Sequence, residues 1–376
     1  MTEKWVQGEV VSVKHWTDSL YSIKIDAPNV RFTAGQYTKI SLNIDDEDVA
    51  RPYSFVNSPD ESLLEIYSVS VPNGPLSTSL KKLNKGDKVA IVSIAKYISN
   101  EECDYAYNYI TNKGYKVVSL NKTILKKRGM FSGTDQERIQ LLQDNLDNPK
   151  VKAIFFARGG YGSIRIIDKI DFTKFLIKPK WLIGFSDITV FLSHISSNYN
   201  CNSIHASMPV NYSSTLETSK MEIFNLLSGV KNPIKIPFNK YNTKGVSKGK
   251  LIGGNLSVLC SILNSNSFPK TTGSILIIED VDEYLYSIER MMYTLKRSGV
   301  LKNISGLIVG EFSKIKDNKP KFGKNIYQLI NQFLIEYKYP VCFNFPVGHI
   351  KNNTPIIMNH TVKLSVGKNV ELFYLD

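Results

Sequence analysis

The 376-residue sequence has little of what would assign it to a membrane, secreted or metal-binding class. No apolar run approaches the length of about 18 residues that a membrane-spanning helix needs, and the N-terminus holds no apolar segment of a secretory signal. The cysteines are few and scattered, without the spacing of metal ligands: Cys103, Cys201, Cys260 and Cys342. These absences favour a protein of the reducing cytoplasm, with no membrane partner and no metal ion.

Basic residues are in excess, with a formal net charge of +13, and this raises nucleic acid as a partner. Most of them are single lysines spread along the chain. The densest clusters, Lys81-Lys82 and Lys126-Lys127-Arg128, lack interleaved aromatic residues. A solvated, lysine-rich surface is therefore favoured over nucleic-acid binding. The sequence leaves open whether the chain is a monomer or a homodimer.

The N-terminal region alternates apolar and polar residues at the period of β-strands. The pattern predicts antiparallel strands over 7–13, 20–25, 36–42 and 63–71, which together favour a small barrel. Arg51-Pro52-Tyr53-Ser54 is expected at the start of a strand, and Gly74-Pro75-Leu76-Ser77 in a turn. Arg51 could bind a phosphate and Tyr53 could stack on a flat ring, but a plain strand and turn explain the same residues.

The order of these motifs resembles the flavin-binding barrel of bacterial ferredoxin–NADP reductases over residues 1–90, through the segments 16–20, 32–37, 51–60 and 71–77. The resemblance implies that Arg51, Tyr53 and Ser54 hold the flavin and its phosphate, and that Gly74 and Ser77 hold the pyrophosphate. Nothing after residue 93 resembles the nicotinamide-binding domain of those enzymes, and no Gly-x-Gly-x-x-Gly occurs. We therefore expect a truncated barrel without reductase activity, whose binding of FAD is in doubt.

The segment 80–93 fits both the last strand of that barrel and the first strand of an α/β domain. One strand cannot serve both sheets, and the longer domain buries more apolar surface, so we expect the second domain to take it. The chain then reads as a fusion of three parts: a truncated flavin-reductase-like barrel over 1–82, an α/β domain over 83–215 and a C-terminal domain over 246–376.

From Lys88 onward, strand and helix patterns alternate. Strands are predicted over 89–92, 115–119, 151–156 and 181–183, and helices over 100–112, from the capping box at Thr134 to about Leu146, and over 188–195. This order predicts a doubly wound parallel sheet, in which sites lie at the carboxyl ends of the strands. A smaller mixed α+β domain follows, with strands over 274–278, 306–309, 347–349 and 362–366 and helices over 287–297 and 326–337.

The segment Gly184-Phe185-Ser186-Asp187 joins a buried strand to a helix by a turn that is too short for anything but a sharp reversal. Such a turn lifts a serine hydroxyl above the sheet, next to the N–H groups of the helix's first turn. The second glycine of the usual elbow motif is missing, so this stretch by itself favours the plainer explanation, in which Asp187 is a helix N-cap and Ser186 an ordinary turn residue.

A serine nucleophile needs a base and an acid that orients the base. Of the five histidines, His349 is the best placed, because it follows an apolar run and Gly348 and precedes a turn. Glu279 ends the apolar run 275–278 and is therefore expected at a strand end. The order serine, acid, histidine is that of many α/β hydrolases. Structural roles for Glu279 and His349 remain the alternative.

Residues from about 85 to 376 resemble the LD-carboxypeptidases, the serine-peptidase family that also includes microcin C self-immunity peptidases. The matching segments are 131–138, 157–162, 179–189, 253–256, 278–283 and 348–349. The resemblance implies Ser186 as nucleophile, His349 as general base and Glu279 as its orienting acid. It implies an oxyanion hole from the N–H groups of Asp187 and Gly160, and substrate contacts from Gly159, Asn255 and Arg158, the last for the substrate carboxylate.

That family hydrolyses the amide between an L-configured diaminopimelate or lysine and a terminal D-alanine in peptidoglycan tetrapeptides, in the cytoplasm during wall recycling, without a cofactor. We therefore expect a serine carboxypeptidase acting on a peptidoglycan-derived peptide. A flavin-binding redox protein and a microcin-type immunity peptidase are the alternatives.

Overall fold

The computed structural model describes residues 5–16, 20–44, 47–69, 82–118 and 125–375. The chain forms two compact units: Met1–Lys81 together with Asp171–Pro179, and Lys82–Ile170 together with Lys180–Asp376. In the described part of the chain, none of the helices has the length and apolar character that a bilayer crossing requires.

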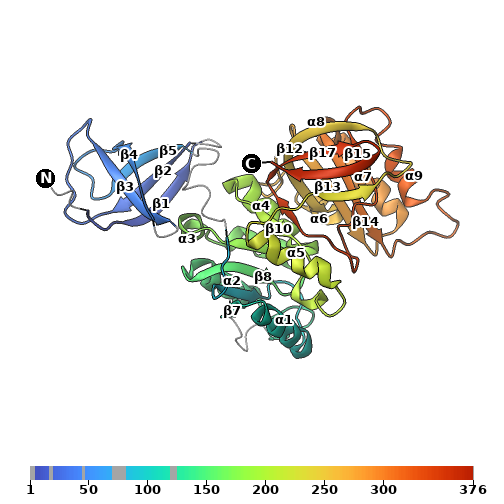
Figure 1. Ribbon diagram of the computed structural model, residues 1–376, viewed down its shortest axis with the longest axis horizontal. Helices are drawn as coiled ribbons and strands as arrows, with labels where there is room; N and C mark the ends of the chain where they lie inside the picture. The colour runs from blue at the N-terminus through green and yellow to red at the C-terminus, as the bar shows by residue number, and fades with distance from the viewer. Residues whose placement is uncertain (1–4, 17–19, 45–46, 70–81, 119–124, 376) are drawn as a thin grey trace. The chain divides into compact units, whose positions relative to one another are not determined.

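The first unit is antiparallel, as predicted. It holds a three-stranded sheet in the order β1-β2-β5 and a two-stranded ribbon, β3-β4 (Figure 1). The strands are β1 (Glu9–His15), β2 (Leu20–Asp26), β3 (Tyr37–Ile44), β4 (Glu47–Ser54) and β5 (Leu64–Val69). The described apolar core is small: Phe32, Leu64 and Ile66 are buried, and the Phe32 ring stacks on Phe55 at 4.1 Å.

The motif Arg51-Pro52-Tyr53-Ser54 lies at the end of strand β4, not at the start of a strand as the sequence suggested. Strand β4 begins at Glu47, which pairs with Ile44 at the end of β3, and β4 pairs with β3 along its whole length. Pro52 is tolerated there because β4 has β3 as its only strand partner in the described residues, and a proline without N–H can occupy such an edge.

Strand β6 (Lys88–Val92) belongs to the second unit, as predicted for the segment that two domains could claim. It lies between β8 and β7 in a six-stranded sheet, and Val89, Ala90, Ile91 and Val92 are at most 1% exposed. A strand covered on both faces is typical of a parallel α/β sheet. The N-terminal sheets therefore do not include this strand.

The six-stranded sheet has the order β16-β10-β9-β8-β6-β7 and is parallel except for β16, which pairs antiparallel with β10. This confirms the predicted doubly wound sheet. The remaining strands are β7 (Lys116–Val117), β8 (Val151–Phe156), β9 (Trp181–Gly184), β10 (Ser203–His205) and β16 (Ile356–Met358).

The predicted capping box opens helix α2, where the Thr134 hydroxyl accepts from the N–H of Glu137 and the Glu137 carboxylate accepts from the N–H of Thr134. A second capping box, between Ser99 and Glu102, opens α1. The helices of this part of the chain are α1 (Asn100–Asn112), α2 (Asp135–Asp147), α4 (Thr189–Tyr199) and α5 (Glu217–Leu227), with short 3₁₀ turns at Ser163–Arg165, Ile167–Lys169, Ser186–Ile188 and Pro209–Asn211. Helix α3 (Thr173–Ile177) lies within the segment Asp171–Pro179, which belongs to the first unit.

The C-terminal part is a seven-stranded sheet in the order β11-β18-β17-β12-β13-β14-β15, parallel from β12 to β15 and antiparallel on the other side. Its strands are β11 (Ile234–Pro237), β12 (Gly245–Asn255), β13 (Ile275–Val281), β14 (Gly306–Ser313), β15 (Val341–Cys342), β17 (Thr361–Val366) and β18 (Asn369–Tyr374). One continuous apolar core joins this sheet to its helices, α6 (Leu256–Ser261), α7 (Leu285–Arg297), α8 (Val300–Asn303) and α9 (Ile326–Asn331). Helix α4 contacts both β9 and β12, which brings the two sheets together (Figure 1).

Two sequence predictions in this part are wrong. Residues 347–349 form a loop and not a strand, and helix α9 ends near Asn331 instead of Tyr337. In both places buried apolar residues gave the expected periodicity. Val347 is buried in an irregular segment, and Phe333 and Leu334 pack into the core from a turn. Tertiary burial thus produced patterns that mimic regular structure.

The second unit should fold without the residues before Lys82. Leu83 is buried and its N–H donates to Leu227 at 2.7 Å, so a chain of residues 82–376 keeps this anchor and all of β6. In thermal scans followed by circular dichroism, we expect the 82–376 chain to unfold cooperatively. Its melting temperature should lie within a few degrees of the temperature at which the second unit unfolds in the full chain.

A chain that starts at Ile94 and lacks β6 is the matched control. Loss of the buried Val89, Ile91 and Val92 removes about 5 kcal/mol or more, which is comparable to the whole stability of a domain. We expect that chain to be unfolded. A folded 94–376 chain, or an unfolded 82–376 chain, would contradict the assignment of β6 as the strand that completes this sheet.

Candidate active site

Ser186 lies on a sharp turn between strand β9 and helix α4. Its backbone has a φ of 62°, a left-handed conformation that residues with a side chain seldom adopt. Ser186 is also the only residue from Trp181 to Ile195 that is not fully buried. A strained, solvent-reachable serine between strand and helix has the geometry of a nucleophile elbow, despite the missing second glycine.

The carboxylate of Asp187 ties this turn to the glycine loop after strand β8. It accepts hydrogen bonds from the N–H and the hydroxyl of Ser163, at 2.9 and 2.7 Å. Burial raises the pKa of Asp187, whereas the hydrogen bonds from Ser163 and Gly162 lower it. Asp187 forms no N-cap bond, so the alternative interpretation as an ordinary helix cap does not describe its side chain.

Arg138, from helix α2, fixes the same loop from the other side. Its side chain is completely buried and donates to the carbonyl of Ile94 and, at 3.3 Å, to that of Gly162. It also pairs with the carboxylate of Asp135. A buried guanidinium needs such partners, so removal of any of them would leave an uncompensated charge. The loop at Gly162 is therefore held firmly.

Gly159 brings this loop into contact with the serine. A Cβ atom on Gly159 would lie 3.3 Å from Ser186 Oγ and 3.1 Å from Met208 Cε, so the close approach requires glycine. Gly160 has a φ of 108°. Among the residues that the structure describes, the N–H groups of Gly160 and Asp187 have no hydrogen-bond acceptor. Unpaired donors beside a serine hydroxyl have the chemistry of an oxyanion hole.

His349 and Glu279 form a hydrogen-bonded pair from the C-terminal part. His349 Nδ1 lies 2.7 Å from Glu279 Oε2; the histidine side chain is 19% exposed and the glutamate is completely buried. Glu279 is inside β13, which continues to Val281, and not at the strand's end as predicted. Because Nδ1 is engaged by the carboxylate, Nε2 is the nitrogen that can accept a proton from a nucleophile.

The loop that carries His349 is shaped by close packing on Glu279. A Cβ atom on Gly348 would lie 3.1 Å from Glu279 Oε2, and the N–H of Gly348 donates to the buried Asn353 at 3.0 Å. The His349 ring lies 4.6 Å from the ring of Phe185, the residue before Ser186. The structure thus gathers the elbow, the histidine and the acid at the carboxyl ends of the two sheets.

His205, which the sequence gave no reason to select, is completely buried beside this group. Its ring lies 5.6 Å from Phe185, and neither ring nitrogen has a hydrogen-bond partner in the described part of the chain. Burial lowers its pKa to about 4, with an opposing contribution from the negative charge of Glu279. His205 is therefore neutral near pH 7 and adds no charge next to His349.

The two predicted polar substrate contacts already have partners within the protein. Arg158 Nη1 donates to the carbonyl of Tyr97 at 3.3 Å. The Asn255 amide caps helix α6 by accepting from the N–H of Val258, and donates to Asp280 Oδ1 at 3.0 Å. Contact of Arg158 and Asn255 with a substrate stays a prediction.

Of the residues predicted to hold a flavin, Arg51 and Ser54 are exposed and Tyr53 is half-buried, all on strand β4. Arg51 Nη1 donates to the carbonyl of its neighbour Ala50 at 2.8 Å. Gly74 and Ser77 lie outside the described residues.

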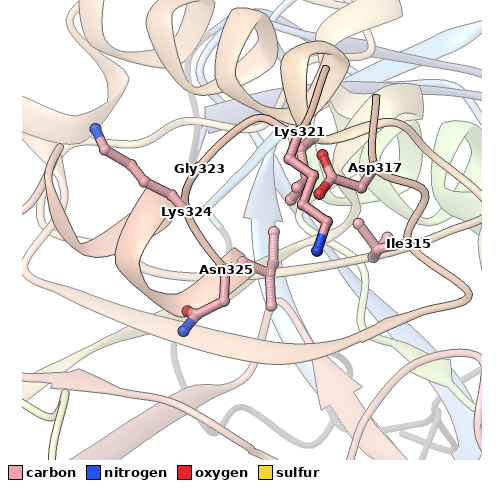
Figure 2. Close-up of a pocket in the computed structure, with 8 residues that line it drawn as sticks. Ile315, Asp317, Lys321, Gly323, Lys324 and Asn325 are labelled. Carbon is pink, nitrogen blue, oxygen red and sulfur yellow. The ribbon is translucent and has the colours of Figure 1, made fainter. Parts of the chain in front are cut away.

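A pocket of about 460 Å³ lies apart from the candidate catalytic residues, between the start of α7 and the segment before α9. Figure 2 shows its polar lining, which includes Asp317, Lys321, Lys324 and Asn325. None of the residues predicted to act in catalysis lines this pocket.

Asp280, the residue after Glu279, should make the stability of the folded protein depend on pH. Burial, and then the charge of Glu279, raise the pKa of Asp280 to about 7. Because this folded-state pKa is above the unfolded one, the native state binds more protons between about pH 4 and 7, and stability falls as the pH rises through that range. In Asp280→Asn this loss is absent. In urea unfolding, we expect the free energy of unfolding of the variant, measured relative to that of the parent, to rise by a few kcal/mol between pH 5 and 8. A difference between the two free energies that does not change with pH would contradict this.

Segments of the chain match three known protein domain families. Residues 89–206 match the LD-carboxypeptidase N-terminal domain, residues 248–364 match the LD-carboxypeptidase C-terminal domain, and residues 9–93 match the oxidoreductase FAD-binding domain. The last match includes β6, a strand of the six-stranded sheet, and ends one residue after it.

Proteins of related sequence also fall into two groups, one similar to the carboxypeptidase domains and one similar to the FAD-binding segment. A probable murein peptide carboxypeptidase of Bacillus subtilis is 30% identical over 275 residues, which are 72% of this chain and 86% of that protein. A flavodoxin/ferredoxin–NADP reductase of Escherichia coli is 54% identical over 91 residues, which are 24% of this chain and only 37% of the reductase.

Solved structures resemble the second unit's fold. The muramoyltetrapeptide carboxypeptidase from Oxalobacter formigenes has a TM-score of 0.71 at 25% identity, covering 77% of this chain and 99% of its own. A microcin C7 self-immunity protein has the same TM-score at 19% identity, covering 79% of this chain and 98% of its own, which establishes a shared fold. With its relatives, its matched domains and its fold in agreement, this chain belongs to the LD-carboxypeptidase family, and its residues 9–93 match the oxidoreductase FAD-binding domain.

Proposed function

We propose that the protein is a serine-type LD-carboxypeptidase that releases the terminal D-alanine of murein tetrapeptides in the cytoplasm. The observation that carries this proposal is the His349–Glu279 hydrogen bond at 2.7 Å, with the His349 ring 4.6 Å from the ring of Phe185, the chain neighbour of the strained, half-buried Ser186. A hydroxyl, an imidazole and a carboxylate are the parts that serine acyl transfer requires.

In the proposed reaction, Ser186 Oγ attacks the carbonyl carbon of the scissile amide while His349 Nε2 takes its proton. Glu279 stabilises the imidazolium that forms, and the N–H groups of Asp187 and Gly160 stabilise the negative oxygen. His349 then gives the proton to the leaving nitrogen of D-alanine. A water molecule, deprotonated by His349, attacks the acyl-enzyme, and the proton returns to Ser186, which restores the enzyme.

The substrate assignment is supported by the relatives. The Bacillus subtilis relative is described as a murein peptide carboxypeptidase, and the Oxalobacter formigenes structure as a muramoyltetrapeptide carboxypeptidase. The microcin immunity protein shares only the fold, so a nucleotide-linked peptide is an outcome to test by substrate profiling. All four cysteines are free, which suits the proposed cytoplasmic setting.

Flavin binding fits the described residues poorly. Strand β6, the last strand within the FAD-binding match, is part of the six-stranded sheet. The Arg51 guanidinium donates a hydrogen bond to the carbonyl of Ala50 on its own strand. The similarity to the reductase covers 37% of that protein's length, and the residues that follow in this chain match the two LD-carboxypeptidase domains instead. We propose no step through a flavin. Visible flavin absorbance in protein that has been mixed with FAD and then dialysed would contradict this.

Ser186→Ala should abolish the release of D-alanine from a muramoyl tetrapeptide. Loss of a serine nucleophile removes nearly all of the rate that the catalytic group supplies, so we expect a drop in kcat of about 10⁴-fold or more. D-alanine release is measured by a coupled D-amino-acid oxidase assay, and circular dichroism checks the fold.

Ser213→Ala is the matched control, since Ser213 is an exposed serine of the same part of the chain. It should keep the activity of the parent. Appreciable D-alanine release by Ser186→Ala, at a level above the contaminant rate of a mock purification, would reject Ser186 as the nucleophile.

A further inference from the structure

Lys96 follows strand β6 by four residues and lies against the glycine loop after strand β8. Its N–H donates to the carbonyl of Gly159 at 3.4 Å. Its side chain runs over Gly160: a Cβ atom there would lie 2.5 Å from Lys96 Cδ and 2.8 Å from Cε. The glycine at 160 therefore makes room for the lysine stem as well as for its own φ of 108°.

Gly160 is the chain neighbour of the residue that contacts the nucleophile. Gly159, the neighbour of Gly160, is the residue whose Cβ would touch Ser186 Oγ at 3.3 Å. Consecutive Cα atoms are about 3.8 Å apart, so the end of the Lys96 side chain lies within a few ångströms of Gly160, whose N–H is one of the candidate oxyanion donors, and of Gly159.

A carboxypeptidase substrate has a negative charge within a few ångströms of the amide that is cleaved. The free carboxylate of the terminal residue is separated from the scissile nitrogen by a single carbon. A cation that binds it must therefore lie beside the oxyanion hole, on the leaving-group side of the carbonyl. An internal amide of a longer peptide has no charge at that point, so the same cation would favour cleavage at the chain end.

Lys96 has a charge available for this purpose. It is half-buried, and within the described ranges no carboxylate lies at salt-bridge distance from its ammonium group. Arg158 is less suited, because its guanidinium donates to Tyr97. Lys127, from the basic cluster noted in the sequence, lies 4.4 Å over the Tyr97 ring and adds to the positive potential here.

We propose that Lys96 binds the C-terminal carboxylate of the peptide substrate and thereby makes the enzyme selective for cleavage of the terminal residue. The inference rests on the proposed function, since it concerns the same site. Lys96 is then a specificity residue that acts through charge on the leaving group, and not a proton carrier.

The test compares one tetrapeptide with a terminal D-alanine carboxylate and its C-terminal amide, which lacks the charge. Loss of a charge-assisted hydrogen bond is worth about 10- to 100-fold in affinity. For Lys96→Met we expect kcat/KM on the acid to fall by that factor, mainly through KM, and kcat/KM on the amide to stay unchanged. Lys96→Arg should keep most of the preference for the acid.

Lys152→Met is the matched control, because Lys152 is an exposed lysine near the opposite, amino end of strand β8. It should keep the parent's preference for the acid. If Lys96→Met keeps that preference, or if Arg158→Gln loses it while Lys96→Met does not, the assignment of Lys96 is overturned. Thermal unfolding of each variant verifies that the fold is intact, and Lys96→Arg reports on the charge if Lys96→Met does not fold.

Binding separates this inference from the proposed function. Calorimetric titration of Ser186→Ala with the acid and the amide, with and without Lys96→Met, requires no turnover. Acid-selective binding that depends on Lys96 supports the inference even if the parent releases no D-alanine, an outcome that rejects only the proposed function. Equal binding of acid and amide, or no binding of either, overturns the inference.

Discussion

The hydrogen bonds between Asp187 and Ser163 are the contact on which the candidate site depends. They join the turn after β9 to the loop after β8, so that the serine and the glycine N–H groups occupy fixed places relative to each other. The contact is buried, and a carboxylate without these donors would be left uncompensated in an apolar region. The close approach of Gly159 to Ser186 and the guanidinium of Arg138 behind Gly162 follow from the same constraint.

The acid and base come from a different sheet, and packing rather than proximity in sequence brings them to the serine. Helix α4, which follows the nucleophile turn, contacts strand β12 of the C-terminal sheet, and the backbone N–H of Asn255 donates to the Thr189 hydroxyl at the start of that helix. Glu279 is on the neighbouring strand β13. The helix that begins at the nucleophile thus also sets the distance to the sheet that carries the acid.

Much of this arrangement could be predicted from the sequence, because it is encoded locally. The capping box at Thr134, the buried strand 151–156 and the reversal at Ser186 each follow from a few adjacent residues. The loop at His349 could not be predicted, since Phe343, Phe345 and Val347 alternate as in a strand while Asn344 takes a φ of 59° that ends regular pairing. The partners of Asp187 and the position of Lys96 depend on segments that are distant in sequence, and no local pattern marks them.

Strand β16 carries a consequence for synthesis of the chain. Residues 356–358 complete the six-stranded sheet by pairing with β10, about 150 positions earlier. On the ribosome, β10 therefore presents an open edge until almost the whole polypeptide has emerged from the exit tunnel. During that interval the edge is exposed to pairing with other nascent chains, so a holding chaperone has its greatest effect late in translation.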